Sequence, residues 1–279
     1  MGYRWNALRG PMRPQSARAT RLLASAALAA VLVLSAAGCK TTGDDTTGSI
    51  AGSTAPKSDA EYRGELGALS ARYQSNPGDP EPAITYAKAL RATGQRAQAV
   101  AVLQQASIRN PNNMKLLGAY GRALADAGEY TEALDALERA HTPDNPDWRI
   151  LNAQGAVLDQ MGRHAEAQRH YSAALKIMPN EPSVLSNLGL SYLLEKNLKR
   201  AEFTLRKAVG QANASPKIRQ NLALVVGLEG RYAEAEKIAS ADVPPADAEA
   251  NVAYLRQMLS QKGALKDGGA PYVPPDPGT

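Results

Sequence analysis

Three polar residues between positions 164 and 170 are the first place in this 279-residue chain to look for chemistry. His164, Glu166 and His170 are residue types that bind metal ions, and a metal-binding histidine pair on one helix usually stands four residues apart. These two histidines stand six apart, and the sequence contains no HExxH motif. We therefore interpret all three as solvated polar positions and expect neither a metal site nor a cofactor.

Other catalytic motifs are also missing from the sequence. There is no G-x-G-x-x-G, no P-loop and no G-x-S-x-G, so the sequence does not indicate binding of a dinucleotide or nucleotide or a hydrolase nucleophile. His141 lies in a turn rich in Pro and Asp and has no cysteine or serine partner by motif. We expect no catalytic residues, no small-molecule substrate and no enzymatic activity.

Small residues recur instead at a fixed interval along the chain. Four glycines are separated by 34 residues or a multiple of 34, and an alanine stands five residues after each of them. The fourth unit has the alanine at the same place but lacks the glycine. Such a period indicates a repeat array in which each unit buries its apolar side against its neighbours. The residues that define the repeat are Gly94, Gly128, Gly162 and Gly230, with Ala99, Ala133, Ala167, Ala201 and Ala235.

Each unit is predicted to be two antiparallel helices joined by a tight turn at the glycine. Glycine suits that position because the chain leaves a helix through a left-handed conformation, and alanine lets two helices approach closely. The fourth unit has Lys196 and Asn197 instead, and there we expect Asn197 to adopt the left-handed conformation and the turn to be slightly altered. The predicted units span 80–113, 114–147, 148–181, 182–215 and 216–245.

The segments that flank these units are predicted to cap the array. Residues 59–79 and 246–262 each have helical spacing of apolar residues, so the repeats at 80–245 are expected to lie between two capping helices. Residues 263–279 are rich in Gly and Pro and are predicted to be disordered. A proline-rich docking peptide is the alternative function for this tail.

The positive charge of the chain is confined to its N-terminal segment. Residues 1–38 contain five arginines and no acidic residue, which leaves 27 basic residues against 27 acidic ones in the remainder. The balance argues against a nucleic-acid surface. The 16 uncharged residues of Leu22–Ala37 are too few for a membrane span, so 1–38 is predicted to be a signal peptide that is removed, with Met1 or Met12 as its start.

Cys39 follows the apolar run directly and is the only cysteine. The run Leu34–Cys39 resembles the lipobox of bacterial lipoproteins, in which the cysteine is lipidated; a signal cut by an ordinary signal peptidase is the alternative. Residues 40–58 are Thr-, Gly- and Ser-rich, so 39–58 is predicted to be a lipidated cysteine with a flexible tether. Since Lys40 replaces the aspartate common in retained lipoproteins, the resemblance implies an outer-membrane anchor facing the periplasm.

The 34-residue unit resembles the tetratricopeptide repeat (TPR), with Gly at place 15, Tyr130 or Tyr232 at place 17, and Pro111 or Pro179 near place 32. Segments 141–167 and 220–245, together with the lipobox, resemble the TPR lipoproteins of the tight-adherence (Flp) pilus system. The resemblance implies an all-α, right-handed α-solenoid of about five helix pairs. It also implies a scaffold that assists a secretin and other pilus or secretion proteins; a TPR lipoprotein that docks a cell-wall or polysaccharide enzyme is the alternative.

In TPR arrays the partner binds the inner face of the first helices, so we assign the binding groove to that face. Asparagine amides there could donate to and accept from a bound backbone, while leucines bury its side chains. In the alternative interpretation the leucines pack under the capping helix, the asparagines bond within the fold, and the bases pair with acids three residues away. The predicted groove residues are Lys88, Arg91, Lys115, Arg122, Arg149, Asn152, Asn187, Leu190, Leu193, Leu194, Asn221, Leu224 and Leu228.

Overall fold

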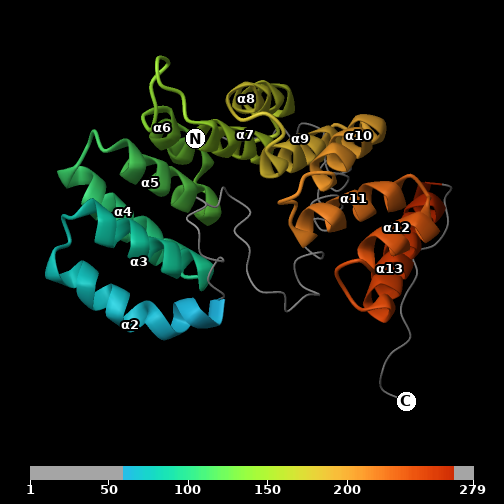
Figure 1. Cartoon of the computed structure of the whole chain (residues 1–279), viewed down its shortest axis with the longest axis horizontal. Coiled ribbons are helices and arrows are strands. Elements are labelled where there is room, and N and C mark those ends of the chain that lie inside the picture. Colours follow the sequence, from blue (N-terminus) through green and yellow to red (C-terminus); the bar gives the residue numbers. More distant parts are fainter. Residues whose placement is uncertain (1–58, 267–279) are drawn as a thin grey trace, which may run out of the picture. The chain divides into compact units, whose positions relative to one another are not determined.

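The computed structural model describes residues 59–266, with side chains from 60 to 260. Predictions for the signal peptide, for Cys39 with its tether, and for residues 267–279 lie outside this range. The described chain is all-α (Figure 1) and contains no strand, only an isolated bridge between Thr142 and Asn145. The helices are α2 (Asp59–Ser75), α3 (Pro80–Ala92), α4 (Arg96–Arg109), α5 (Met114–Ala127), α6 (Tyr130–Glu138), α7 (Trp148–Gln160), α8 (His164–Ile177), α9 (Pro182–Leu194), α10 (Leu198–Val209), α11 (Pro216–Leu228), α12 (Tyr232–Ala239) and α13 (Pro245–Lys266).

The helices form five successive pairs, from α3 with α4 to α11 with α12. Each helix packs against the next one along the chain, and each first helix also packs against the first helix of the following pair. Buried apolar clusters follow one another along the array, each shared by neighbouring pairs. The predicted α-solenoid of five helix pairs is confirmed. None of the helices in the described part is long and apolar enough to cross a membrane.

Small residues make the close crossings within each pair. The alanines at 99, 133, 167, 201 and 235 are all fully buried. Opposite them, a Cβ added to Gly121 would lie 2.6 Å from Leu137 Cγ, and one added to Gly189 would lie 2.7 Å from Leu205 Cγ. These contacts leave no room for a larger residue, which explains why small side chains follow the period.

The four turn glycines all have positive φ, from 75° to 86°. In the third pair the Gly162 N–H donates to the Asp159 carbonyl and the Arg163 N–H donates to the Leu158 carbonyl. These two hydrogen bonds cap the C-terminal end of α7. In the fourth pair, the expectation of a slightly altered turn with Asn197 in the left-handed conformation was wrong. Lys196, at the period position of glycine, has φ of 64°, and the equivalent two hydrogen bonds form with unchanged geometry. Asn197 has φ of −89° and instead accepts the Arg200 N–H, so it caps α10.

We expect Lys196→Gly to stabilise the array by about 0.5–1 kcal/mol, because glycine removes the cost of a left-handed conformation at a lysine. The matched change at the same place of the third pair, Gly162→Ala, should destabilise it by about 1 kcal/mol, since an added Cβ meets no atom within 4 Å and only backbone strain remains. Chemical denaturation followed by circular dichroism measures both. Equal effects of the two substitutions would contradict this account.

The two ends of the array are covered by single helices. Tyr62 and Tyr73 of α2 are buried against the first pair, and Val252 and Leu255 of α13 are buried against α11 and α12. Helix α13 continues to Lys266, so the prediction that it ends at residue 262 was short by one turn. Both capping helices extend the packing pattern of the repeats rather than starting a new fold.

Candidate functional site

The predicted binding residues all lie on the first helices α3, α5, α7, α9 and α11, which pack side by side. We call this set of helices the first-helix row. Two of its basic residues form ion pairs across neighbouring units: Arg91 Nε lies 2.5 Å from Asp126 Oδ2, and Lys115 Nζ lies 2.7 Å from Glu81 Oε1. The two partners of each pair belong to successive repeats, so the alternative interpretation, in which the bases pair with acids three residues away, is wrong for both. The polar side chains of this row join one repeat to the next.

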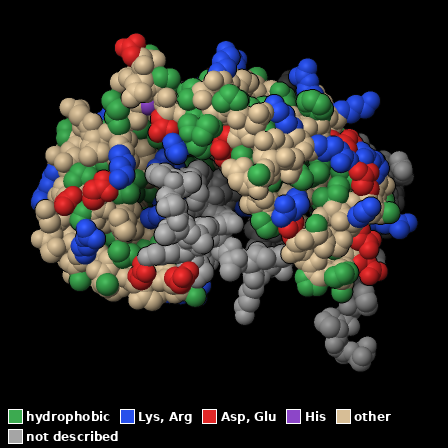
Figure 2. Space-filling model, in the orientation of Figure 1, with side chains coloured by type: hydrophobic (Ala, Val, Ile, Leu, Met, Phe, Trp, Pro, Cys, Tyr) green, Lys and Arg blue, Asp and Glu red, His purple; other side chains and the backbone are tan. Residues whose placement is uncertain are grey.

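Three other basic residues have distinct surroundings. Lys88 is exposed, with Nζ 5.9 Å from the ring centre of Tyr62 in the capping helix α2. The Arg149 guanidinium lies 4.5 Å from the ring centre of Trp148, and its Nε is buried without a hydrogen-bond partner. Arg122 is half-buried on α5. Figure 2 shows acidic and basic side chains lying next to one another across the visible face rather than gathering by sign.

The asparagines of the row form hydrogen bonds within the fold. Asn187 Nδ2 donates to Asn152 Oδ1 over 3.0 Å, and Asn221 Nδ2 donates to Ser186 Oγ over 3.1 Å. Asn152 is only 2% exposed, whereas Asn187 and Asn221 are half-buried. This geometry agrees with the alternative interpretation of the asparagines, in which they hold adjacent first helices together. Binding of a partner by the other hydrogen-bonding groups of these amides stays a prediction.

The leucines of the row divide between core and surface. Leu193 is 5% exposed and belongs to the core of the last pairs, so it is not available to a partner. Leu190, Leu224 and Leu228 are half-buried and pack against the cluster that includes Val252 of α13, as the alternative interpretation requires. Leu194, at the end of α9, is also half-buried. These four leucines keep part of their surface accessible along α9 and α11.

A polar network centred on Asp159 was missed by the sequence interpretation. Asp159 Oδ1 accepts from His164 Nδ1 over 2.9 Å and from Ser191 Oγ over 2.8 Å, and Oδ2 accepts from the Tyr171 hydroxyl over 2.9 Å. Burial raises the pKa of the Asp159 carboxyl, although the hydrogen bonds from His164, Ser191 and Tyr171 oppose it. The network connects α7, α8 and α9. Ser191 is fully buried, so the Asp, His and Ser cannot serve as an accessible catalytic set.

The histidines are not the solvated residues that the sequence suggested. His164 forms a hydrogen bond with Asp159. His170 is half-buried, and its Nδ1 has no hydrogen-bond partner. Burial, followed by the nearby His141 and Arg169, lowers the pKa of His170. Gln154 of α7 is 2% exposed, with Nε2 3.4 Å from His141 Nε2 and an unpartnered Oε1. No group of three His, Cys, Asp or Glu side chains comes together as a metal site within the described residues.

Two family models match the chain. Residues 158–224 match the tetratricopeptide repeat, and residues 60–140 match subunit 3 of the anaphase-promoting complex, or cyclosome. No curated protein matches the sequence significantly. The match at 158–224 and the helix-pair architecture make these units similar to tetratricopeptide repeats.

Solved structures give the same fold. PilW, described as a widely conserved type IV pilus biogenesis factor, is similar with a TM-score of 0.60 and 17% identity over 69% of this chain and 91% of PilW. A thermophilic TPR protein of Thermus thermophilus is similar with a TM-score of 0.56 and 20% identity over 64% of this chain and all of that protein. At these identities the similarity shows the fold alone.

Proposed function

We propose that this array of tetratricopeptide repeats is a non-enzymatic periplasmic adaptor, lipid-anchored in the outer membrane, that binds proteins during assembly of a Flp/Tad-type pilus or secretion apparatus. A secretin is the partner we expect. The observation that carries the proposal is the first-helix row, whose half-buried leucines on α9 and α11 leave apolar surface beside polar asparagines. The resemblance of the lipobox, tether and repeats to TadD, and the similarity of fold to PilW, support a role in pilus assembly.

Capture of partners from cell envelopes tests the proposal. The tagged full chain should retain a secretin and pilus proteins after solubilisation of the membranes. Capture of cell-wall hydrolases or polysaccharide synthases would instead favour the alternative function, a TPR lipoprotein that docks such an enzyme. Retention of neither class would overturn the adaptor proposal.

The binding surface is tested by a matched pair of substitutions on neighbouring helices. Leu194→Lys places a charge at a half-buried position of the first-helix row and should reduce capture at least about tenfold, because an apolar contact is replaced by a desolvated charge. Phe203→Ser, on the second helix α10, removes a side chain that is 75% exposed and should leave capture unchanged. Thermal unfolding of both variants should match the parent. The reverse order of effects would place the binding surface on the second helices.

The anchor is tested at Cys39. Each buried methylene of an acyl chain contributes about 0.8 kcal/mol, and stable anchoring takes two signals such as two acyl chains, so we expect Cys39→Ala to move the protein from the membrane to the soluble fraction. Fractionation of the periplasm and membranes measures this. Unchanged membrane association would contradict the lipid anchor but would leave the binding surface untouched.

A further inference from the structure

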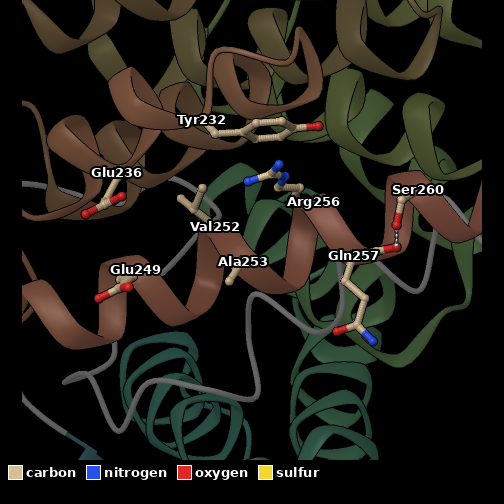
Figure 3. Close-up of a pocket in the computed structure, with 8 residues that line it drawn as sticks. All are labelled: Tyr232, Glu236, Glu249, Val252, Ala253, Arg256, Gln257 and Ser260. Carbon is tan, nitrogen blue, oxygen red and sulfur yellow. Dashed lines mark hydrogen bonds between the residues drawn. The ribbon is translucent and has the colours of Figure 1, made fainter. Parts of the chain in front are cut away.

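A cavity of about 600 Å³ lies between α12 and α13 at the C-terminal end of the array (Figure 3). We call it the α12–α13 pocket. Helix α12 contributes Tyr232 and Glu236 to its lining. Helix α13 contributes one stripe of side chains at helical spacing, which consists of Glu249, Val252, Ala253, Arg256, Gln257 and Ser260. The pocket therefore runs along one side of the last helix of the array.

The small residue Ala253 stands at the place where each earlier first helix receives its second helix. Helices α13 and α11 align on buried residues of equal spacing, which are Ala248, Val252 and Leu255 in α13 and Ile218, Leu222 and Val225 in α11. Ala253 then corresponds to Ala223, which stands 34 residues after Gly189, one of the residues at the close crossings within pairs. Among the described helices, α13 packs only against α11 and α12. This side of α13 is therefore suited to a further helix that the described chain does not supply.

The charged groups of the pocket are separated along its length. Figure 3 shows Glu236 and Glu249 toward one end, and Arg256 with Gln257 toward the other. The Arg256 guanidinium lies beneath the Tyr232 ring, 5.6 Å from its centre. Among the residues with described side chains, neither Arg256 nor Glu249 forms an ion pair. A helix of one charge sign would be repelled at one end, so the pocket fits a helix that carries a base and an acid in the opposite order.

Helix α13 of a second copy has this pattern when it runs antiparallel to the first. In a two-fold interface the same surface of both copies takes part, so each contact occurs twice. With the axis beside Ala253, Glu249 of each copy faces the partner's Arg256, because these residues lie four before and three after the alanine. The alanine at the centre lets the two helices approach closely, as the small residues do within the repeats.

We propose that the α12–α13 pocket binds helix α13 of a second copy, so that two arrays join at their C-terminal ends through antiparallel α13 helices paired by Arg256 and Glu249. The proposal does not depend on the adaptor function. It brings two first-helix rows into one assembly, which would increase the avidity for a partner with several binding sites.

Charge reversal tests the pairing in the full chain carrying Cys39→Ser. Equilibrium sedimentation should show that the parent is a dimer at micromolar concentrations. Arg256→Glu and Glu249→Arg should each weaken dimerisation at least about tenfold, because each brings like charges together. The double variant restores opposite charges and should return to within about threefold of the parent. Arg96→Glu, at an exposed position of α4, is the matched control and should leave dimerisation unchanged.

Two results of this experiment would overturn the proposal. A parent chain that sediments as a monomer would leave the pocket to a different protein. A double variant that dimerises as weakly as the single variants would show that Arg256 and Glu249 do not meet across the interface. Circular dichroism of each variant should match the parent, which separates a loss of dimer from a loss of folding.

Disulfide formation is a second test, in which the charges of the pocket stay intact. In the full chain carrying Cys39→Ser, an introduced cysteine is the only thiol. Ala253→Cys should form a disulfide-linked dimer at least about tenfold faster than Tyr254→Cys, because only residue 253 lies beside the axis, where the two chains come close enough to be bridged. Tyr254 is the matched control, since it is the next residue of α13 and 48% exposed but does not line the pocket. Equal rates would also overturn the proposal.

Discussion

Tyr171→Ala is expected to lower the free energy of unfolding by about 3–5 kcal/mol, the largest effect of a single substitution that we predict. The ring is 1% exposed and belongs to the cluster that includes Leu151, Leu158 and Val184. A Cβ added to Gly155 would lie 2.5 Å from Tyr171 Cε1, so the ring fills the space that the glycine leaves. Removing the ring creates a cavity where α7, α8 and α9 meet.

Two controls separate this cavity from other effects. Tyr171→Phe keeps the ring and deletes only the hydrogen bond to Asp159, which should cost about 1 kcal/mol. Tyr254→Ala removes a tyrosine that is 48% exposed on α13 and should change stability by less than about 0.5 kcal/mol. Urea denaturation of the three variants measures the differences. A loss below about 1 kcal/mol in Tyr171→Ala would show that the site collapses around the missing ring.

The contact between Gly155 and Tyr171 shows what a period can predict. Equivalent contacts join Gly121 to Leu137 and Gly189 to Leu205, with the same separation along the chain. A helix crossing that recurs in every unit requires a small residue at the same place, which is glycine or alanine in all five units. The helix pairs, the turn glycines and the buried alanines were predictable for this reason.

The polar contacts between units were not predictable in the same way. Asp159 has Ala125 and Leu193 at the equivalent places of the neighbouring units, so its network occurs once and leaves no periodic signal. The bond between Asn187 and Asn152 depends on side-chain rotamers in two different helices. Residue type alone therefore identified the asparagines as polar but could not tell partner binding from bonding within the fold.

The fourth turn shows that position can outweigh residue preference. Asparagine tolerates the left-handed conformation better than lysine, which favoured Asn197. The packing of α9 against α10 fixes where the chain must reverse, and that place falls on Lys196. Asn197 then caps the following helix, so the same residue preference is satisfied in a different role.

Asp159→Ala is expected to destabilise the junction of the third and fourth pairs by about 2–3 kcal/mol, because it leaves buried donors without an acceptor. The fully buried Ser191 hydroxyl and the Tyr171 hydroxyl both lose their partner. Hydrogen exchange should therefore accelerate in α7, α8 and α9 and stay unchanged in α3 and α4. In a double-mutant cycle, Ser191→Ala should cost less in the Asp159→Ala background than in the parent, and additive costs would contradict a direct bond.

The pH dependence gives a second test of Asp159, with Asp159→Asn as the matched variant. Since burial raises the carboxyl pKa above 3.8 in the folded state, folding favours the protonated acid. The stabilising contribution of the neutral acid is complete below the unfolded pKa and is lost as pH rises through the folded pKa. The parent should therefore gain stability relative to Asp159→Asn as pH falls from 7 toward 4. A relative loss over this range would mean that the hydrogen bonds to the ionised carboxylate outweigh its burial.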